Sequence, residues 1–252
     1  ENLLALESLT DNEFMESNKQ ELQQQNTAIW KQFQGTIEKR KDEYYVRFPW
    51  KNDATTLPDN KAMEVKRLQA IITKFKQDPE MLQEYHETVA SQLHQNIIEE
   101  VDEFKPSNGS VIHYLPHHTV LTPHKETTKT RIVNDGSAHT KEASSLNEPL
   151  HQRRDFLPQI CDILLRFHIG DIALTSNVEK AFLQIRLQEQ DRDATRFLGM
   201  HDISKPFEQQ NMVTYRFTRV TFELNCSPFL LAGTIKHHLN NCLHDPKLVE
   251  DL

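Results

Sequence analysis

The sequence lacks any long apolar run. Of its 252 residues, 37% are hydrophobic and 26% are charged, enough to build one good-sized core or two small ones. No stretch approaches the roughly 20 consecutive apolar residues that a membrane-spanning helix requires. The opening ENLLALESL has neither the basic nor the apolar region of a secretory signal. We therefore expect a soluble, cytoplasmic chain with no membrane partner.

Cysteine is scarce, and few of the possible metal ligands are spaced as a metal site requires. Cys161, Cys226 and Cys242 are an odd set without paired spacing, which favours reduced, buried thiols over a disulfide framework. The 13 histidines suggest a zinc hypothesis, because His238 and Cys242 have a spacing that can place two ligands on one helix face. No second pair lies at a matching interval, so we expect no zinc site. No serine or cysteine stands in a sharp glycine-flanked turn, which argues against a nucleophile triad.

Basic residues do not outnumber acidic ones. Lys and Arg number 29 against 37 Asp and Glu, which gives a formal net charge of -8. Phosphate contacts need clustered Lys and Arg, so tight nucleic-acid binding is not expected of this chain alone. The chain begins with Glu1 rather than Met, and Leu252 follows an acidic stretch without a stop signal. We interpret the sequence as part of a longer protein.

Apolar periodicity predicts mainly helices before residue 105. Helices are expected over about residues 11–39, 65–76 and from 79 onward, and a strand over 44–48. Asp78 can cap the third helix, and Pro79 suits its first turn. Asn96 is expected to take the left-handed conformation that ends this helix.

A polar, turn-rich stretch from Lys105 to Gly109 marks the best internal boundary. Beyond it, residues 110–138 predict two extended strands joined by a polar tip, and a helix capped by Asp155 follows. Further on, ATRFLGM and VTYRFTRVTF predict an antiparallel pair.

A last helix is expected to open at Ser227 and Pro228. Its apolar stripe is predicted to be Leu231, Ile235 and Leu239.

The segment DIALTSNVEKAFLQIRL, residues 171–187, organises the second part of the chain. Alternation over 172–178 predicts a buried strand. The alternation is interrupted at Glu179 and Lys180. It resumes over 182–187 with the aliphatic residues at odd-numbered positions, whereas Ile172, Leu174 and Val178 stand at even-numbered ones. We therefore expect a strand, a kink and a second strand.

These blocks, in this order, resemble the reverse transcriptases of BEL/Pao long-terminal-repeat retrotransposons. The resemblance is carried by ALTSNVEKAFLQI, by the hairpin words HYLPHHTVLTP and TTKTRIVNDGSA, and by SSLN and TFELNCSPFLL. It covers nearly the whole chain and is strongest from His113 to Leu239. It implies an α+β fold, the fingers and partial palm of a right-hand polymerase. Residues 1–104 would be a helical lead and the start of the fingers, and 105–252 the fingers hairpin and the N-terminal part of the palm.

The resemblance also implies roles for single residues. Asn177 stands at the position of an aspartate that binds both magnesium ions, and Phe182 at that of the aromatic residue that excludes a ribose hydroxyl. Lys129 and Arg131 fall where the family places basic residues over an incoming triphosphate.

A further block of the family, which holds the template and the nucleotide, corresponds here to Phe222, Ser227 and Pro228. The chain departs from the family pattern in this block, where Glu223 replaces a glycine. It also departs in the hairpin, where Asn134 replaces a phenylalanine and Gly136 an alanine.

The intact family uses Mg²⁺, which two-metal sites bind through carboxylate oxygens. The neutral amide of Asn177 is a poor substitute for a carboxylate. The family's second aspartate pair, which follows the helix beginning at Ser227, does not occur before Leu252. We therefore expect no intact metal site and no magnesium bound by this chain.

Two functional hypotheses follow. In the first, the chain belongs to the RNA-directed DNA polymerase of a retrotransposon polyprotein and is catalytically inactive in this copy. Its partners would be an RNA template, a primer-template duplex and the remainder of the polyprotein, in a cytoplasmic retrotransposon particle. In the alternative, it is a domesticated or relict scaffold that binds RNA or protein without catalysis.

Overall fold

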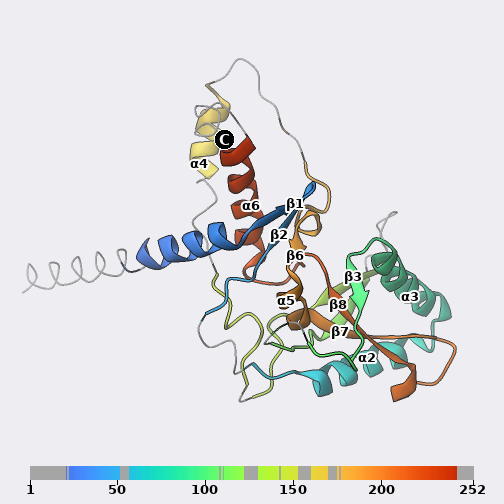
Figure 1. Cartoon of the computed structure of the whole chain (residues 1–252). Coiled ribbons are helices and arrows are strands. Elements are labelled where there is room, and N and C mark those ends of the chain that lie inside the picture. The colour runs from blue at the N-terminus through green and yellow to red at the C-terminus, as the bar shows by residue number, and fades with distance from the viewer. Residues whose placement is uncertain are drawn as a thin grey trace, which may run out of the picture.

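The computed structural model describes residues 21, 23–51, 57–107, 109, 111–121, 130–141, 143–152, 160–169, 175 and 177–242. Within them, helices pack against two three-stranded sheets and a separate hairpin (Figure 1). Most strand pairs are antiparallel, and the pair between β2 and β6 is parallel. This mixture is compatible with the α+β class.

The first sheet begins directly after a helix over residues 23–36. β1 (Glu38–Arg40) and β2 (Glu43–Val46) form a hairpin, and β2 also pairs with β6 (Arg186–Leu187). Lys41 turns the hairpin with a φ of 56°. The helix predicted to reach residue 39 is therefore too long, because residues 38–40 pair with β2 instead.

The next two helices match their sequence signals. α2 spans Lys61–Phe75 and α3 spans Pro79–His94. The side chain of Asp78 caps α3 by accepting a hydrogen bond from the backbone N–H of Met81 at 3.2 Å. Asn96 has a φ of 52°, so the predicted left-handed end of this helix is confirmed.

The second sheet has the order β3-β8-β7 (Figure 1). β3 spans Ile98–Glu100, β7 spans Arg196–Met200 and β8 spans Met212–Phe217. The predicted antiparallel pair of β7 and β8 is confirmed, and a 3-10 helix over Gln209–Asn211 enters β8.

The predicted hairpin is also confirmed. β4 (His117–Leu121) pairs antiparallel with β5 (Thr130–Asn134), with Val120 opposite Arg131 and His117 opposite Asn134. Residues 122–129, which include Lys129, lie outside the described residues. The hairpin packs on α2 through β4 and on α3 through β5.

The strand predicted over 172–178 is wrong where the structure describes it. Thr175, Asn177 and Val178 belong to no strand and are exposed, because no described strand pairs with them. The residues 171–174 and Ser176 lie outside the described part.

The second predicted strand is wrong over its first residues. Ala181–Gln184 form a 3-10 helix, since Lys180 turns the chain with a φ of 49° and its carbonyl accepts from Leu183 N–H at 2.8 Å. Only β6 pairs as a strand. A short helix α5 (Glu189–Arg192) and a 3-10 turn (Asp193–Thr195) then lead into β7.

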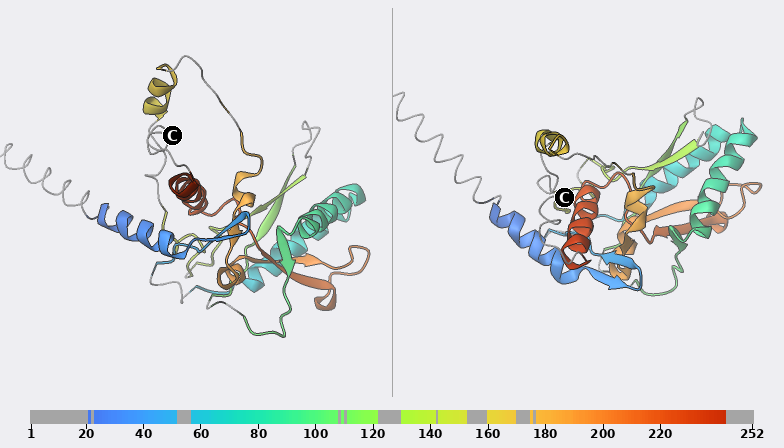
Figure 2. Two further views of the ribbon diagram at one scale, coloured as in Figure 1. Left: turned by 45° about the horizontal axis from the view of Figure 1, so that its top comes forward. Right: turned by 90° about the horizontal axis from the view of Figure 1, so that it is seen from above.

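The helix expected after Asp155 is α4, Ile160–Phe167, which stands clear of both sheets (Figure 2). Asp155 itself lies outside the described residues. Ile160, Leu165 and Ile169 are 71%, 67% and 82% exposed. Cys161 is exposed as well, so its predicted burial is wrong, because nothing in the described part covers this helix.

The last helix, α6, spans Ser227–Cys242 and begins where predicted. Its predicted stripe is confirmed only in part: Leu231 packs against buried apolar residues, but Ile235 is 46% exposed. The buried face is instead centred on Phe229, Leu230 and Thr234. Gly233 explains this rotation. A Cβ atom at Gly233 would lie 3.1 Å from the Phe33 ring, so the absence of a side chain lets α6 approach the helix over residues 23–36.

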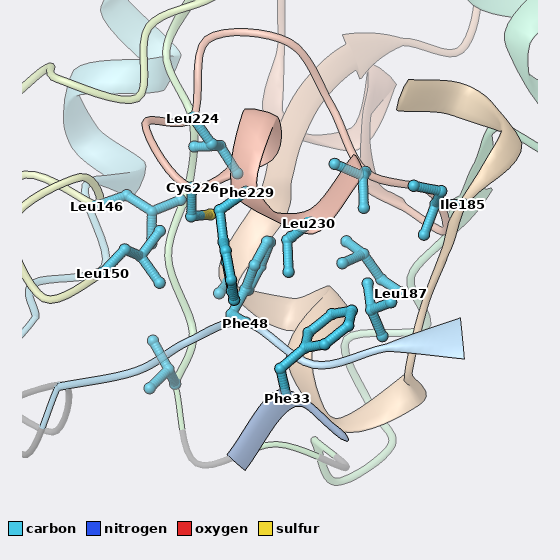
Figure 3. Close-up of a cluster of buried hydrophobic side chains, with 14 of the residues drawn as sticks. Phe33, Phe48, Leu146, Leu150, Ile185, Leu187, Leu224, Cys226, Phe229 and Leu230 are labelled. Atoms are coloured by element: carbon cyan, nitrogen blue, oxygen red, sulfur yellow. The ribbon is translucent and has the colours of Figure 1, made fainter. Parts of the chain in front are cut away.

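Two apolar clusters hold these elements together. The first cluster joins the helix over 23–36, β2, β6 and the start of α6, and Figure 3 labels ten of its members: Phe33, Phe48, Leu146, Leu150, Ile185, Leu187, Leu224, Cys226, Phe229 and Leu230. The predicted burial of Cys226 is confirmed, and burial raises the pKa of its thiol. The second cluster joins α2 and α3 to the β3-β8-β7 sheet. Each cluster contains residues from both sides of residue 105, where the sequence predicts a division.

None of the described helices combines the length and the apolar character needed to span a bilayer.

Candidate functional site

Several segments that are distant in sequence surround one cavity, which we call the β5 cavity. Its volume is about 200 Å³. It is lined by Thr88 and Gln92 of α3, residues 131–134 of β5, Leu183, and residues 221–223 before α6, with Ile97 and Phe217 adding apolar surface. The cavity therefore lies between the hairpin and the turn that leads into α6.

The hairpin side of the cavity rests on a buried polar network. His117, at the start of β4, places Nδ1 at 2.7 Å from Glu64 Oε1 and Nε2 at 2.8 Å from the hydroxyl of Tyr85. The same carboxylate accepts from the backbone N–H of Leu198 at 2.9 Å. One glutamate thus ties α2, β4 and β7 together, and the histidine extends the link to α3.

The protons in this network follow from the donors available. An ionised Glu64 can only accept hydrogen bonds, so Nδ1 of His117 donates to it. When the ring carries only this proton, its Nε2 accepts from the Tyr85 hydroxyl. Burial, with a smaller contribution from the charge of Glu64, raises the pKa of Tyr85 and keeps this hydroxyl protonated.

The opposite wall is a tight turn over residues 221–227. The Ser227 hydroxyl donates to the carbonyl of Thr221 at 2.6 Å, and the Ser227 N–H donates to the carbonyl of Leu224 at 3.0 Å. Glu223 has a φ of 74°, a left-handed conformation that costs a non-glycine residue about 1–2 kcal/mol. The turn thus holds a strained, exposed glutamate at the rim of the cavity.

Asn147 connects the two walls. Its Nδ2 donates to the carbonyl of Glu223 at 3.2 Å, and its Oδ1 accepts from the N–H of Asn225 at 2.9 Å. Its own backbone N–H donates to the carbonyl of Gly136 at 3.0 Å. A Cβ atom at Gly136 would lie 2.9 Å from the carbonyl oxygen of Glu223, so the close approach requires glycine there.

The aromatic residues predicted for the site lie together. The rings of Phe182 and Phe222 pack edge to face, with centroids 5.0 Å apart and an interplanar angle of 85°. Phe182 also packs against the first cluster, whereas Phe222 is 45% exposed. Phe222 therefore has an open face for contact with a planar ligand.

Two buried polar atoms of lining residues have no hydrogen-bond partner among the residues that the structure describes. They are Oγ1 of Thr221 and Oδ1 of Asn134. Both residues line the cavity, and Thr221 is only 2% exposed. Buried polar atoms are nearly always paired, so these two need an explanation.

The residues present do not fit a pair of magnesium ions. Asn177 is exposed and offers one neutral amide oxygen, and its acidic neighbour Glu179 is also exposed. No group of three or more His, Cys, Asp or Glu side chains in the described ranges is arranged to hold a metal. Since magnesium bridging a phosphate requires carboxylates, we derive no metal-dependent step for this chain.

The structure brings some of the predicted site residues together and separates others. Arg131 and Phe222 line the β5 cavity, and Phe182 lies beside them through Phe222 and Leu183. Ser227 is buried and serves to close the turn, and Pro228 is exposed outside the cavity lining.

Sequence reasoning found only part of what holds the site. SSLN, the word that ends at Asn147, carries part of the resemblance, but the contacts of Asn147 and Glu64 with residues far away in the sequence have no local signal. His117 is one of the 13 histidines that suggest a zinc hypothesis, and the structure places it in a buried network instead.

Comparison with known proteins identifies no relative. No family model matches the chain, and the search of curated proteins finds no match either.

Proposed function

We propose that this chain is the fingers and the first part of the palm of a retrotransposon reverse transcriptase of BEL/Pao type, in a form that binds RNA or a primer-template duplex without polymerising. The proposal rests on the sequence resemblance. One structural observation supports it. Arg131, Phe222 and the turn that holds Phe182 come from three separate blocks of that resemblance and surround a single cavity.

The chemistry available at this surface agrees with binding rather than catalysis. Arg131 is exposed on β5 and Lys180 is exposed beside Phe182, so both can contact phosphate, and Phe222 can stack on a base. The position of the family's first aspartate is Asn177, which cannot supply the negative charge that phosphoryl transfer needs. The chain then acts within a cytoplasmic particle, together with the remainder of its polyprotein.

The alternative is a relict or domesticated scaffold that binds protein. The exposed apolar side chains of α4 favour this alternative, since contiguous apolar surface commonly marks a protein contact. In that case nucleic-acid binding is absent and Arg131 has no measurable role.

A binding titration tests the proposal. Fluorescence anisotropy with an RNA–DNA primer-template at several salt concentrations should give weak, salt-sensitive binding. Arg131→Ala should weaken it and reduce the slope of log affinity against log salt by about 0.9, as expected for one lost phosphate contact. Lys66→Ala, an exposed basic residue on α2, should leave it unchanged. Equal effects of the two substitutions would refute the assigned surface.

Primer extension tests the inactive state. Neither the natural chain nor Asn177→Asp should incorporate labelled deoxynucleotide on an RNA template with magnesium, because one carboxylate does not make a two-metal site. Extension by the natural chain would show that Asn177 is not at the catalytic position.

A further inference from the structure

The turn after β3 presents an aromatic side chain to solvent. Phe104 is 100% exposed. Its backbone is held in place, because Asp102 Oδ1 accepts the Phe104 N–H at 3.1 Å and the Lys105 N–H donates to the Asp102 carbonyl at 3.1 Å. Little backbone order therefore has to be gained when the ring is buried by a partner. An aromatic side chain held ready in this way is a typical anchor of a protein interface.

A cavity opens beside this turn, and we call it the α2–β8 cavity. Its volume is about 520 Å³. Its apolar lining comes from α2, β7 and β8 and consists of Ala62, Val65, Leu198 and Met212. Glu103, the residue before Phe104, also lines the cavity, whereas Phe104 does not. The ring and the cavity are therefore neighbours, yet the ring does not fill the cavity of its own chain.

Glu103 ties the turn to the cavity wall. Its carboxylate accepts hydrogen bonds from Lys61 Nζ at 2.8 Å and from Thr214 Oγ1 at 2.7 Å, and both of these residues line the cavity. The Tyr114 hydroxyl donates to the same carboxylate at 2.8 Å. These contacts keep Phe104 at the edge of the cavity, so the ring and the cavity form one surface.

The cavity matches an aromatic side chain in size and in character. A dry apolar cavity of about 150 Å³ can hold a benzene ring, so this larger cavity has room for a phenylalanine ring. The thioether of Met212 can adapt its shape to such a ring. Asp59, Lys61 and Glu103 surround the apolar lining with charges of both signs. An apolar centre within a polar rim is the usual anatomy of a protein interface.

We propose that a second copy of this chain occupies the α2–β8 cavity, with Phe104 of each protomer inserted into the cavity of its partner. A two-fold axis in the plane of the contact, passing between ring and cavity, makes both insertions at once, because such an interface uses the same patch on both protomers. The contact is small, so the dimer is weak. The two cavities share no lining residue, so this face is separate from the β5 cavity.

The test is the dissociation constant of the dimer, measured by sedimentation velocity over a range of protein concentrations. All chains carry Ile160→Gln and Leu164→Gln, so that the exposed apolar side chains of α4 do not contribute. Phe104→Ala removes both ring contacts and should raise the dissociation constant about a hundredfold, at about tenfold for each ring. Val178→Ala, at a 57% exposed position that lines neither cavity, should leave it unchanged.

Mixing two variants tests the exchange of rings between protomers. Ala62 is exposed, so Ala62→Trp fills the cavity without disturbing the core, and it should also weaken the dimer about a hundredfold. A mixture of Phe104→Ala and Ala62→Trp offers one intact ring and one open cavity that fit each other. The mixed dimer should therefore form about tenfold more tightly than the dimer of either variant. Thermal denaturation confirms that each variant is folded.

Three results overturn the proposal: a parent chain that stays monomeric at every concentration, association unchanged by Phe104→Ala, or a mixture that associates no better than its components. Phe104 is fully exposed, so its removal leaves the core intact, and this variant alone decides if Ala62→Trp does not fold. None of these results bears on the proposed function, because the titration with Arg131→Ala concerns the other cavity.

Discussion

Asn147 holds the backbone of Asn225, because its Oδ1 accepts the Asn225 N–H at 2.9 Å while its Nδ2 donates to the neighbouring Glu223 carbonyl. Asn147 itself is 4% exposed, and both hydrogen bonds are partly buried. The amide therefore fixes the position of the turn against the loop that follows β5.

Replacing Asn147 by Ala should lower the free energy of unfolding by about 1–3 kcal/mol, because truncation removes its partly buried hydrogen bonds to the Asn225 N–H and the Glu223 carbonyl. Chemical denaturation measures the change. Asn241→Ala, at an exposed helical position whose side chain donates to the His237 carbonyl, serves as the control and should change stability by less than about 0.5 kcal/mol. Equal effects of the two would show that Asn147 does not hold the turn.

Glu223 should be a site where glycine stabilises the fold. Its φ of 74° suits glycine, so Glu223→Gly should raise the free energy of unfolding by about 1 kcal/mol. Glu223→Ala removes the same charge but keeps the strained Cβ atom, and it should give no such gain. Primer-template affinity should rise in both variants, since each removes an anion beside Arg131. An equal gain in stability in Glu223→Ala and Glu223→Gly would show that the lost charge, and not the relieved backbone strain, is the cause.

Glu64 should stabilise the fold by holding the β4–β5 hairpin against α2 and β7. In the natural chain, the backbone N–H of His117 donates to Glu64 Oε2 at 3.3 Å. In Glu64→Gln, the side-chain NH₂ group takes the place of this oxygen and faces the same N–H. Two donors would then face each other in a buried site, and stability should fall by about 1–3 kcal/mol. Glu80→Gln, in the exposed first turn of α3, is the matched control. Urea denaturation of the three proteins decides whether the network stabilises the fold.

Glu103 should contribute to the acid sensitivity of the fold. Burial tends to raise the pKa of Glu103, but hydrogen bonds from Lys61, Thr214 and Tyr114 dominate and lower it to about 2. A carboxyl whose pKa is lowered by folding stabilises the protein above its ordinary pKa of 4.5. This contribution is lost as the pH falls from about 4.5 towards 2.

The measurement is the free energy of unfolding of the natural chain and Glu103→Gln between pH 7 and 2. The variant should be less stable at pH 7, and the difference should shrink below about pH 4.5. A gap of constant size at all pH values would show that the carboxylate charge is not responsible. Glu80→Gln should follow the natural chain.

α4 should promote self-association. Ile160 and Leu164 lie one turn apart on the same helix face and are 71% and 53% exposed, and apolar side chains grouped in this way tend to bury one another. The double variant Ile160→Gln, Leu164→Gln should shift the sedimentation coefficient towards the monomer at high concentration. Ile112→Gln, an isolated exposed residue, should have no effect. A natural chain that remains monomeric at every concentration would contradict the prediction.

Local signals in the sequence predict a large part of the fold. Asp78 and Pro79 mark the start of α3, Asn96 marks its end, and the strand-like runs ATRFLGM and VTYRFTRVTF identify β7 and β8. Each of these features is decided within a few residues of the chain.

The failures have two causes. The stripe of α6 is rotated because Gly233 faces the distant Phe33. Residues 181–184 form a 3-10 helix, although they alternate like a strand, because the left-handed turn at Lys180 starts it locally. For the site, the resemblance brings Arg131 and Phe222 to one cavity. It gives no hint of the unpaired hydroxyl of Thr221, since hydrogen-bond satisfaction is a property of the packed structure.

The first cluster also constrains how the protein is made. It joins Phe33 to Phe229, so the aromatic face of the helix over residues 23–36 is not covered until nearly the whole described chain has been synthesised. At about 5–20 residues per second, a ribosome needs about 10–40 s to translate the intervening stretch. During that time the Phe33 ring lacks its native contact with α6. The start of α6 is therefore the step that ends its exposure on the ribosome.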